Sequence, residues 1–352
     1  MAFAIATVAA AVHVISALSP TFSDFFNRYI GSVVRGALAL LTGILPFSLA
    51  ETVVILLPII FIAVVASSVR AASKSVDSGI RRIISMACAL SLLYSFFVFT
   101  TVVGYNGTPL SSKLGLDERP VSTDELRYAA EYMINKMNEE LGDVTYAYGE
   151  GSVMPYTLGE MNELLLEALD KVSDKYAFLP RLTSRIKPIA LSEPMTYTHI
   201  SGMYTYYTGE SNLNVNFPDY NLPFTAAHEL AHQRGVMREN EANFVAFLVC
   251  IESHDPYVRY SGYLSMYEYL SSALYSADYD AFVEVYTSLD ARVVGEILSY
   301  NRFFEKYRKS VASDISSVMN DTYLKAQGVD AGEKSYGMVV DLACAWVADK
   351  TD

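Results

Sequence analysis

Two long uncharged stretches dominate the first hundred residues. Residues 52–69 and 83–103 contain no Asp, Glu, Lys or Arg and consist mainly of Val, Ile, Leu, Phe and Ala with a few small polar residues. A helix of about 20 apolar residues crosses the hydrocarbon core of a bilayer. Residues 2–18 are also uncharged but shorter, and a cleaved signal peptide is the alternative there, although the basic start of such a peptide is missing. The pattern predicts a membrane anchor over residues 1–104 with three transmembrane helices, at about 2–18, 52–69 and 83–103.

The segment between the second and third stretches is basic. Residues 70–82 carry Arg70, Lys74, Arg81 and Arg82, and we expect a cytoplasmic loop here because positive charge gathers on the cytoplasmic side. Residues 20–50 are compatible with either an interfacial helix or a re-entrant segment. These observations predict a multi-pass protein of the cell membrane, in contact with the lipid bilayer, whose C-terminal domain (residues 105–352) is extracytoplasmic.

The polar pattern of the remaining chain predicts helices around a small sheet. Ser122 with Glu125, and Thr157 with Glu160, have the spacing of capping boxes before apolar stripes. Residues 189–216 are rich in β-forming residues and predict two or three short strands, in 197–200, 203–207 and 213–216. After Pro223 the pattern is helical to the end of the chain. The fold class expected is α+β, mostly helical with a small mixed sheet, preceded by a helical transmembrane region.

Charge and cysteine content narrow the function. The net charge is −13, yet the first 104 residues hold six basic and three acidic residues, so the acidic character lies in the rest of the chain. An acidic domain argues against nucleic acid as a partner, and no obligate protein partner is evident. Three cysteines are too few for a disulfide framework. Cys250 and Cys344 can be buried free thiols, which we favour, or a pair.

One motif in the domain indicates metal chemistry. His228-Glu229-x-x-His232 places two imidazoles on one face of a helix, and Glu229 can then act on a water bound to the metal. Gly235 can end this helix and allow a second helix, from about Arg238, to return to the metal. His199 and His254 lack motif spacing and are not expected to be ligands.

The second helix offers two carboxylates for the third ligand position. Glu239 and Glu241 lie about 200° apart on a helix, so only one of them can face the metal. Glu239 shares its face with Asn243, which can hold a ligand in place through a hydrogen bond. We therefore predict the ligands His228, His232 and Glu239, with Glu241 as the fallback third ligand.

The motifs resemble those of a known group. His228-Glu229-x-x-His232 with Glu239-x-x-Ala242-Asn243 is similar to zincin metallopeptidases whose third ligand is a glutamate. The chain more closely resembles the membrane-anchored domain-of-unknown-function 3810 family of bacteria. The matching segments are residues 228–235, 238–244, 207–214 and Ser335-Tyr336-Gly337, together with the apolar head. Arg238 stands where a metzincin would need histidine.

The resemblance implies a zincin-like domain with Zn²⁺ and a substrate peptide aligned on an edge strand within residues 203–216. The oxyanion then needs a donor besides zinc, for which Tyr336 is the first candidate and Tyr207 and Tyr220 are others. The function expected is a membrane-anchored zinc metallopeptidase that hydrolyses peptide or protein substrates outside the cytoplasm, with Glu229 activating the zinc-bound water. The alternatives are a catalytically silent zincin-like binding or regulatory module of the cell envelope, and a structural membrane protein with a fortuitous motif.

Overall fold

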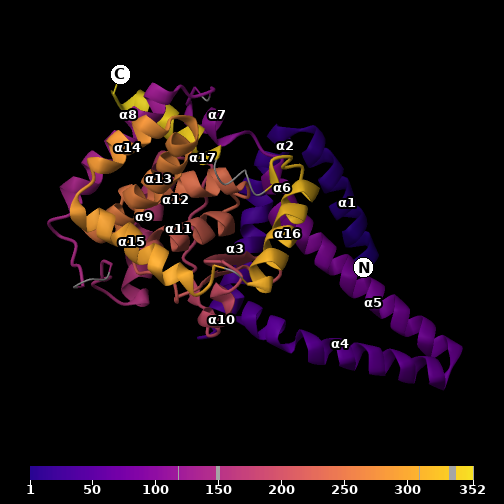
Figure 1. The fold of residues 1–352 in the computed structure, drawn as a ribbon. Coiled ribbons are helices and arrows are strands. Elements are labelled where there is room, and N and C mark those ends of the chain that lie inside the picture. Colours follow the sequence, from indigo (N-terminus) through magenta and orange to yellow (C-terminus); the bar gives the residue numbers. More distant parts are fainter. Residues whose placement is uncertain (118, 148–150, 309, 333–337, 352) are drawn as a thin grey trace.

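The computed structural model describes residues 1–352 except 118, 148–150, 309, 333–337 and 352, and shows a helical hairpin that projects from a rounded body (Figure 1). The head of the chain forms α1 (Ala2–Leu18), α2 (Pro20–Phe26), the π-helical turn η1 (Asn27–Gly31), α3 (Ser32–Gly43), α4 (Leu49–Lys74), α5 (Val76–Phe97), the π-helical turn η2 (Val98–Val102) and α6 (Val103–Tyr105). The remaining helices are α7 (Leu110–Leu114), α8 (Thr123–Glu140), α9 (Leu158–Lys175), α10 (Ser192–Thr196), α11 (Asn221–Gln233), α12 (Glu239–Ile251), α13 (Pro256–Ala277), α14 (Tyr279–Thr287), α15 (Ala291–Glu305), α16 (Val311–Ala326) and α17 (Val339–Thr351).

The projecting hairpin consists of α4 and α5, which meet at Ser75. The Ser75 side chain accepts a hydrogen bond from the Ser78 backbone and caps α5. The expected loop over residues 70–82 is therefore wrong, because both helices extend into it. Arg and Lys have high helix propensity, so each helix extends beyond its apolar stretch.

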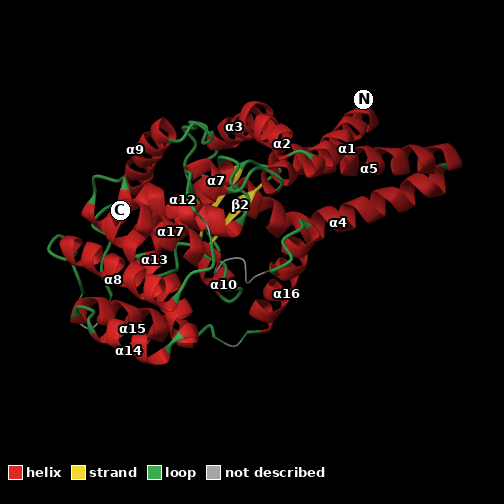
Figure 2. Cartoon of the chain, turned by 90° about the horizontal axis from the view of Figure 1, so that it is seen from above, coloured by secondary structure: helices red, strands yellow, loops and turns green. Residues whose placement is uncertain are grey.

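Within the part of the chain that the structure describes, two helices are long and apolar enough to cross a membrane, Leu49–Lys74 and Val76–Tyr105. The third expected span, α1, is a helix of 17 residues and falls short of that length. It packs against α5 and its N-terminal end stops short of the hairpin tip (Figures 1 and 2). Of the three expected spans, two thus lie on helices with the length and composition to cross a membrane.

The segment left open between the first two apolar stretches is helical over most of its length. Through α2, η1 and α3 it turns a polar side to the body, where Arg35 is fully buried. Its other side exposes large apolar residues, including Phe25, Tyr29 and Val33, spaced one helical turn apart.

The small sheet has the order β1–β3–β2, formed by β1 (Lys187–Pro188), β2 (Gly202–Thr205) and β3 (Glu210–Leu213). β1 pairs parallel with β3, and β2 pairs antiparallel with it, with Tyr204 opposite Ser211. The strand expected at residues 197–200 is wrong: a turn follows α10 there. The strand expected at 213–216 starts earlier and ends at Leu213, because the Asn214 side chain donates to the Ile200 carbonyl and competes with strand pairing.

The core of the body lies between the long helices. α8 packs along α13, and α12 lies between α11, α9, α13 and α17. Both predicted capping boxes are present at the starts of α8 and α9. Cys250 and Cys344 are buried and free. The structure confirms a mostly helical fold with a small mixed sheet.

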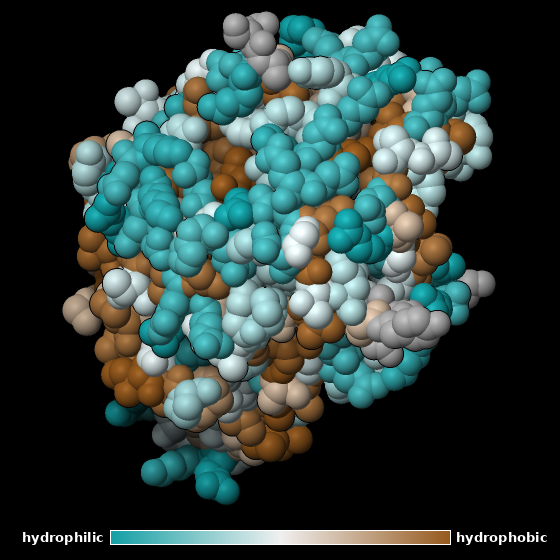
Figure 3. Space-filling model, turned by 90° about the vertical axis from the view of Figure 1, so that its left-hand side faces the viewer, coloured by the Kyte–Doolittle hydropathy of each residue, from teal (hydrophilic) through white to brown (hydrophobic). Residues whose placement is uncertain are grey.

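The face of the body opposite the hairpin is covered largely by hydrophilic side chains with apolar patches between them (Figure 3). The hairpin differs from it, because α4 buries only Ala50 fully. The molecule therefore has one end suited to water and one end suited to lipid.

Candidate metal centre

The helix that carries the histidine motif is the most enclosed helix in the structure. α11 begins at Asn221 rather than after Pro223, since a proline in the first turn gives up no helical hydrogen bond. Every residue from Leu222 to Gln233 is buried. Gly235 has φ 96°, a left-handed conformation that ends the helix, and α12 begins four residues later at Glu239.

This turn brings three predicted ligands together. The Oε2 atom of Glu239 lies 3.2 Å from Nε2 of His228 and 3.4 Å from Nε2 of His232. The three ligand atoms all lie within 4.8 Å of one another, and each residue is 8–9% exposed. The group fits a metal ion by position, by donor type and by limited access to solvent.

The tautomer of His232 supports a cation at this point. Its Nδ1 lies 2.7 Å from the Val236 carbonyl, a distance at which Nδ1–H donates. In the neutral ring the Nε2 lone pair then faces the Glu239 carboxylate, and the two repel each other unless a proton or metal ion lies between them. Nδ1 of His228 has no hydrogen-bond partner among the described residues.

The electrostatics of the cluster are those of strongly coupled charges. Burial lowers the pKa of His232, but the carboxylates of Glu239 and Glu229 outweigh burial and raise that pKa to about 9. Burial raises the pKa of Glu239, but the two histidines outweigh it and hold that pKa well below its ordinary range. The buried cluster thus favours a carboxylate facing positive charge.

Glu229 lies between the cluster and the sheet. Its backbone carbonyl accepts from the Ser211 hydroxyl of β3 at 2.8 Å. A Cβ atom added to Gly202 of β2 would lie 2.6 Å from Oε1 of Glu229, so only glycine fits there. Burial raises the pKa of the Glu229 carboxyl, while His228 and His232 lower it. Its Oε2 has no hydrogen-bond partner in the described parts of the chain.

The two other predicted residues of α12 have different surroundings. Glu241 accepts from the Leu110 backbone at 2.9 Å and pairs with Arg238 at 2.8 Å, away from the cluster. Asn243 is buried, but it interacts with Tyr269. Its Nδ2 has no partner among the described residues, so the expected hydrogen bond from this amide to a ligand is not seen.

The remaining candidates that the structure describes do not join the cluster. Tyr336 lies outside the described residues. Tyr207 packs edge-on against Tyr206 in the turn after β2. Tyr220 donates to Glu268 at 2.9 Å and precedes His228 by about 12 Å along the helix axis. His199 contacts the Tyr307 carbonyl, and His254 pairs with Glu167.

Sequence reasoning missed the residues that join the head of the chain to this centre. Arg35 of α3 donates to the carbonyls of Gln233 and Arg234 at the end of α11, at 3.0 and 3.5 Å. Glu210 of β3 accepts from the backbone of Leu49 and Ala50 and so caps α4. The only signals of these contacts in the sequence were an arginine among apolar residues, Arg35, and a glutamate directly after Gly209.

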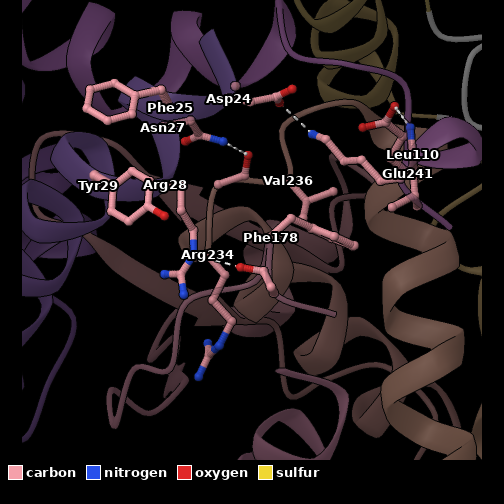
Figure 4. Close-up of a pocket in the computed structure, with 14 residues that line it drawn as sticks. Asp24, Phe25, Asn27, Arg28, Tyr29, Leu110, Phe178, Arg234, Val236 and Glu241 are labelled. Atoms are coloured by element: carbon pink, nitrogen blue, oxygen red, sulfur yellow. Dashed lines mark hydrogen bonds and ion pairs between the residues drawn. The ribbon is translucent and has the colours of Figure 1, made fainter. Parts of the chain in front are cut away.

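The same junction encloses a cavity of about 370 Å³ between α2–η1 and the body. Figure 4 shows Asn27 reaching from this segment, and its Nδ2 donates to the Gly235 carbonyl at 2.9 Å. Arg28 donates to the Ala177 carbonyl at 2.7 Å. The turn between α11 and α12 therefore contacts the head of the chain.

Comparison with known proteins identifies the family. The family described as "Protein of unknown function (DUF3810)" matches residues 26–344, which include the hairpin, the sheet and the cluster of His228, His232 and Glu239. The chain belongs to this family. No curated protein and no solved structure matches the chain. The description of the DUF3810 family names no activity.

Proposed function

We propose that this DUF3810 protein is a membrane-anchored zinc metallopeptidase that hydrolyses peptide bonds outside the cytoplasm. The observation that carries the proposal is the convergence of His228, His232 and Glu239, with the carboxylate of Glu229 beside them. Two imidazoles and one carboxylate leave a coordination position open, as in catalytic zinc sites. A structural site would fill that position with a fourth side chain.

The chain supplies the groups that this reaction needs. Bound zinc would polarise the substrate carbonyl and lower the pKa of a water molecule in the site. Glu229 takes one proton from the attacking water, whose oxygen bonds to the carbonyl carbon, and passes that proton to the nitrogen as the C–N bond breaks. The second proton of the water passes from the new carboxyl group to the amine, so the products are a carboxylate and an ammonium group. Tyr336 remains the first candidate for a donor to the oxyanion.

The sheet offers a place for the substrate beside Glu229. β2 forms one edge of the three-stranded sheet, and an extended peptide can add to such an edge as a further strand. Gly202 of β2 packs directly on Glu229. A peptide on this edge would therefore place a carbonyl next to the proposed base.

The location outside the cytoplasm rests on the charge of the hairpin. Arg70, Lys74, Arg81 and Arg82 all lie within seven residues of the tip at Ser75. The positive-inside rule puts this tip in the cytoplasm and the body on the other side of the bilayer.

Peptide cleavage that depends on zinc tests the proposal. The full chain in detergent is incubated with a mixed-sequence peptide pool, and products are identified by mass spectrometry. We expect cleavage that stops on chelation and returns with added zinc. Zinc retained at one ion per chain with no peptide cleaved would contradict the peptidase and support the silent binding module instead.

A further inference from the structure

The edge of the sheet next to Glu229 carries backbone groups that do not pair with β3. The Ser201 carbonyl accepts from the Asn214 amide, and the Thr205 carbonyl accepts from the Gly209 amide, so these residues face β3. Because backbone groups alternate along an antiparallel strand, those of Gly202 and Tyr204 point away from β3. The backbone of Tyr204 also interacts with Glu229. A substrate strand would bind here.

The far end of this edge leads to the membrane hairpin. After β2 the chain turns, and the Tyr206 ring lies edge-on against Phe97, with 5.2 Å between centroids. Phe97 is the last residue of α5. Tyr323 lies close to both Phe97 and Tyr105, at 6.4 and 6.3 Å, which adds to an aromatic cluster of the kind found at membrane surfaces.

Side-chain exposure locates the membrane surface at the same residue. Phe96 is 36% exposed, whereas Val98 is fully buried in a cluster with residues of α1 and α2. Phe97 lies 22 residues from the tip at Ser75, as Val53 does on α4, where the uncharged residues 52–69 span about 27 Å, close to the hydrocarbon thickness of about 30 Å. With its basic tip at one surface, the hairpin therefore emerges at Phe97 on the other.

β2 thus sets the distance between Glu229 and the membrane surface, and the direction in which a substrate strand runs. Gly202 and Tyr206 are four residues apart, or about 13 Å in an extended chain. β2 runs from Glu229 toward the membrane. A substrate strand added antiparallel, as β3 already is, runs the opposite way, so its N-terminal side lies at the membrane.

We propose that the substrates are polypeptides held in the same bilayer by their N-terminal part, and that the site cuts them about four residues beyond the membrane surface. This inference rests on the peptidase activity proposed above. It also accounts for the close joining of α4 to the sheet and of α3 to the end of α11, which fixes the height of the site above the bilayer.

The test uses the full chain in vesicles of phosphatidylethanolamine and phosphatidylglycerol. One randomised ten-residue segment is presented in three formats: after an apolar helix of about 20 residues, before such a helix, and free. Cleavage rates and positions are read by mass spectrometry. We expect the segment that follows the helix to be cut at least about tenfold faster than the other two formats, because tethering raises its local concentration in the required direction.

A spacer distinguishes cleavage at a fixed distance from the membrane from cleavage at a preferred sequence. With four Gly-Ser residues inserted after the helix, the cut should stay at the same distance from the helix and move relative to the segment. Equal rates for the free and N-terminally anchored formats, or preference for the C-terminally anchored one, overturn this inference and leave the peptidase standing. Absence of cleavage in all three formats contradicts the peptidase itself.

A substitution in the aromatic contact completes the design. Tyr206→Ala should reduce the preference for the N-terminally anchored format at least about threefold, because the turn no longer rests on Phe97. Tyr275→Ala, which removes an exposed tyrosine of α13, is the matched control and should leave the preference unchanged. An unchanged preference in Tyr206→Ala contradicts the role of this contact.

Discussion

The hairpin α4–α5 and the pair α11–α12 are both two consecutive helices joined by a short turn, but they place their side chains in opposite ways. The hairpin exposes Ile, Leu, Val and Phe over most of its length. The pair buries not only its apolar residues but also His228, Glu229, His232 and Glu239. Exposed apolar side chains require lipid, and buried polar ones require partners. The contrast therefore distinguishes the hairpin, whose surface suits lipid, from the helix pair that carries the candidate metal ligands.

The largest effect is expected from the buried base. Glu229→Gln keeps the shape of the side chain but cannot take a proton, so cleavage of the peptide pool should fall about 10²- to 10⁴-fold. Bound zinc should remain, because the other three side chains hold it. Rates from single peptides, with zinc measured on the same samples, check this. Wild-type cleavage by this variant would remove Glu229 from the mechanism.

The contrast in packing can be measured with a pair of aliphatic residues. Leu230 of α11 is fully buried, and Leu230→Ala should lower the free energy of unfolding by about 2–5 kcal/mol. Ile60 of α4 is exposed to the proposed bilayer, where lipid replaces lost contacts. Ile60→Ala should therefore change the free energy of unfolding by less than about 0.5 kcal/mol. Thermal unfolding in vesicles gives both values. Similar losses at the two sites would mean that the hairpin packs against protein.

The junction between the two regions depends on Arg35. Arg35→Met leaves the carbonyls of Asn27, Thr100 and Gln233 without this donor and should cost about 1–3 kcal/mol of stability. Arg70→Met, near the exposed tip of the hairpin, is the control for loss of charge and should have little effect. Equal melting temperatures for the two variants would show that the junction is not held by this side chain.

The smallest effect is expected at the strand next to Glu229. Gly202→Ala pushes a methyl group against the Glu229 carboxylate, and misplacing a catalytic group by about 1 Å costs up to a hundredfold in rate. We expect a loss of about tenfold, with zinc retained. Gly295→Ala, where an added Cβ meets no atom within 4 Å, is the matched control. A rate unchanged by Gly202→Ala would place the substrate elsewhere.

Local signals in the sequence predicted local features of the structure well. The capping boxes at Ser122 and Thr157, and the glycine that ends α11, follow from side-chain chemistry within four residues, and they were confirmed. Helical geometry indicated that only one of Glu239 and Glu241 can face the metal, and the face shared with Asn243 selected Glu239. Of these two glutamates, the structure brings Glu239 to the histidines. These features depend on few neighbours.

The features that sequence missed depend on contacts between distant segments. Arg35 reaches carbonyls almost 200 residues away, and Glu210 caps a helix 160 residues before it. No local pattern encodes such pairings. The strand expected at residues 197–200 failed for a related reason: its β-forming residues lie in a turn fixed by contacts of His199 with the Tyr307 carbonyl.

The central claim is that His228, His232 and Glu239 hold zinc, and its most direct measurement is the zinc content of the purified full chain. We expect about one zinc ion per chain in the wild type and in Glu241→Gln, and loss of that zinc in His228→Ala and Glu239→Gln. Circular dichroism verifies that each variant is folded. A wild type without zinc, or a Glu239→Gln variant that keeps its zinc while Glu241→Gln loses it, would contradict the account.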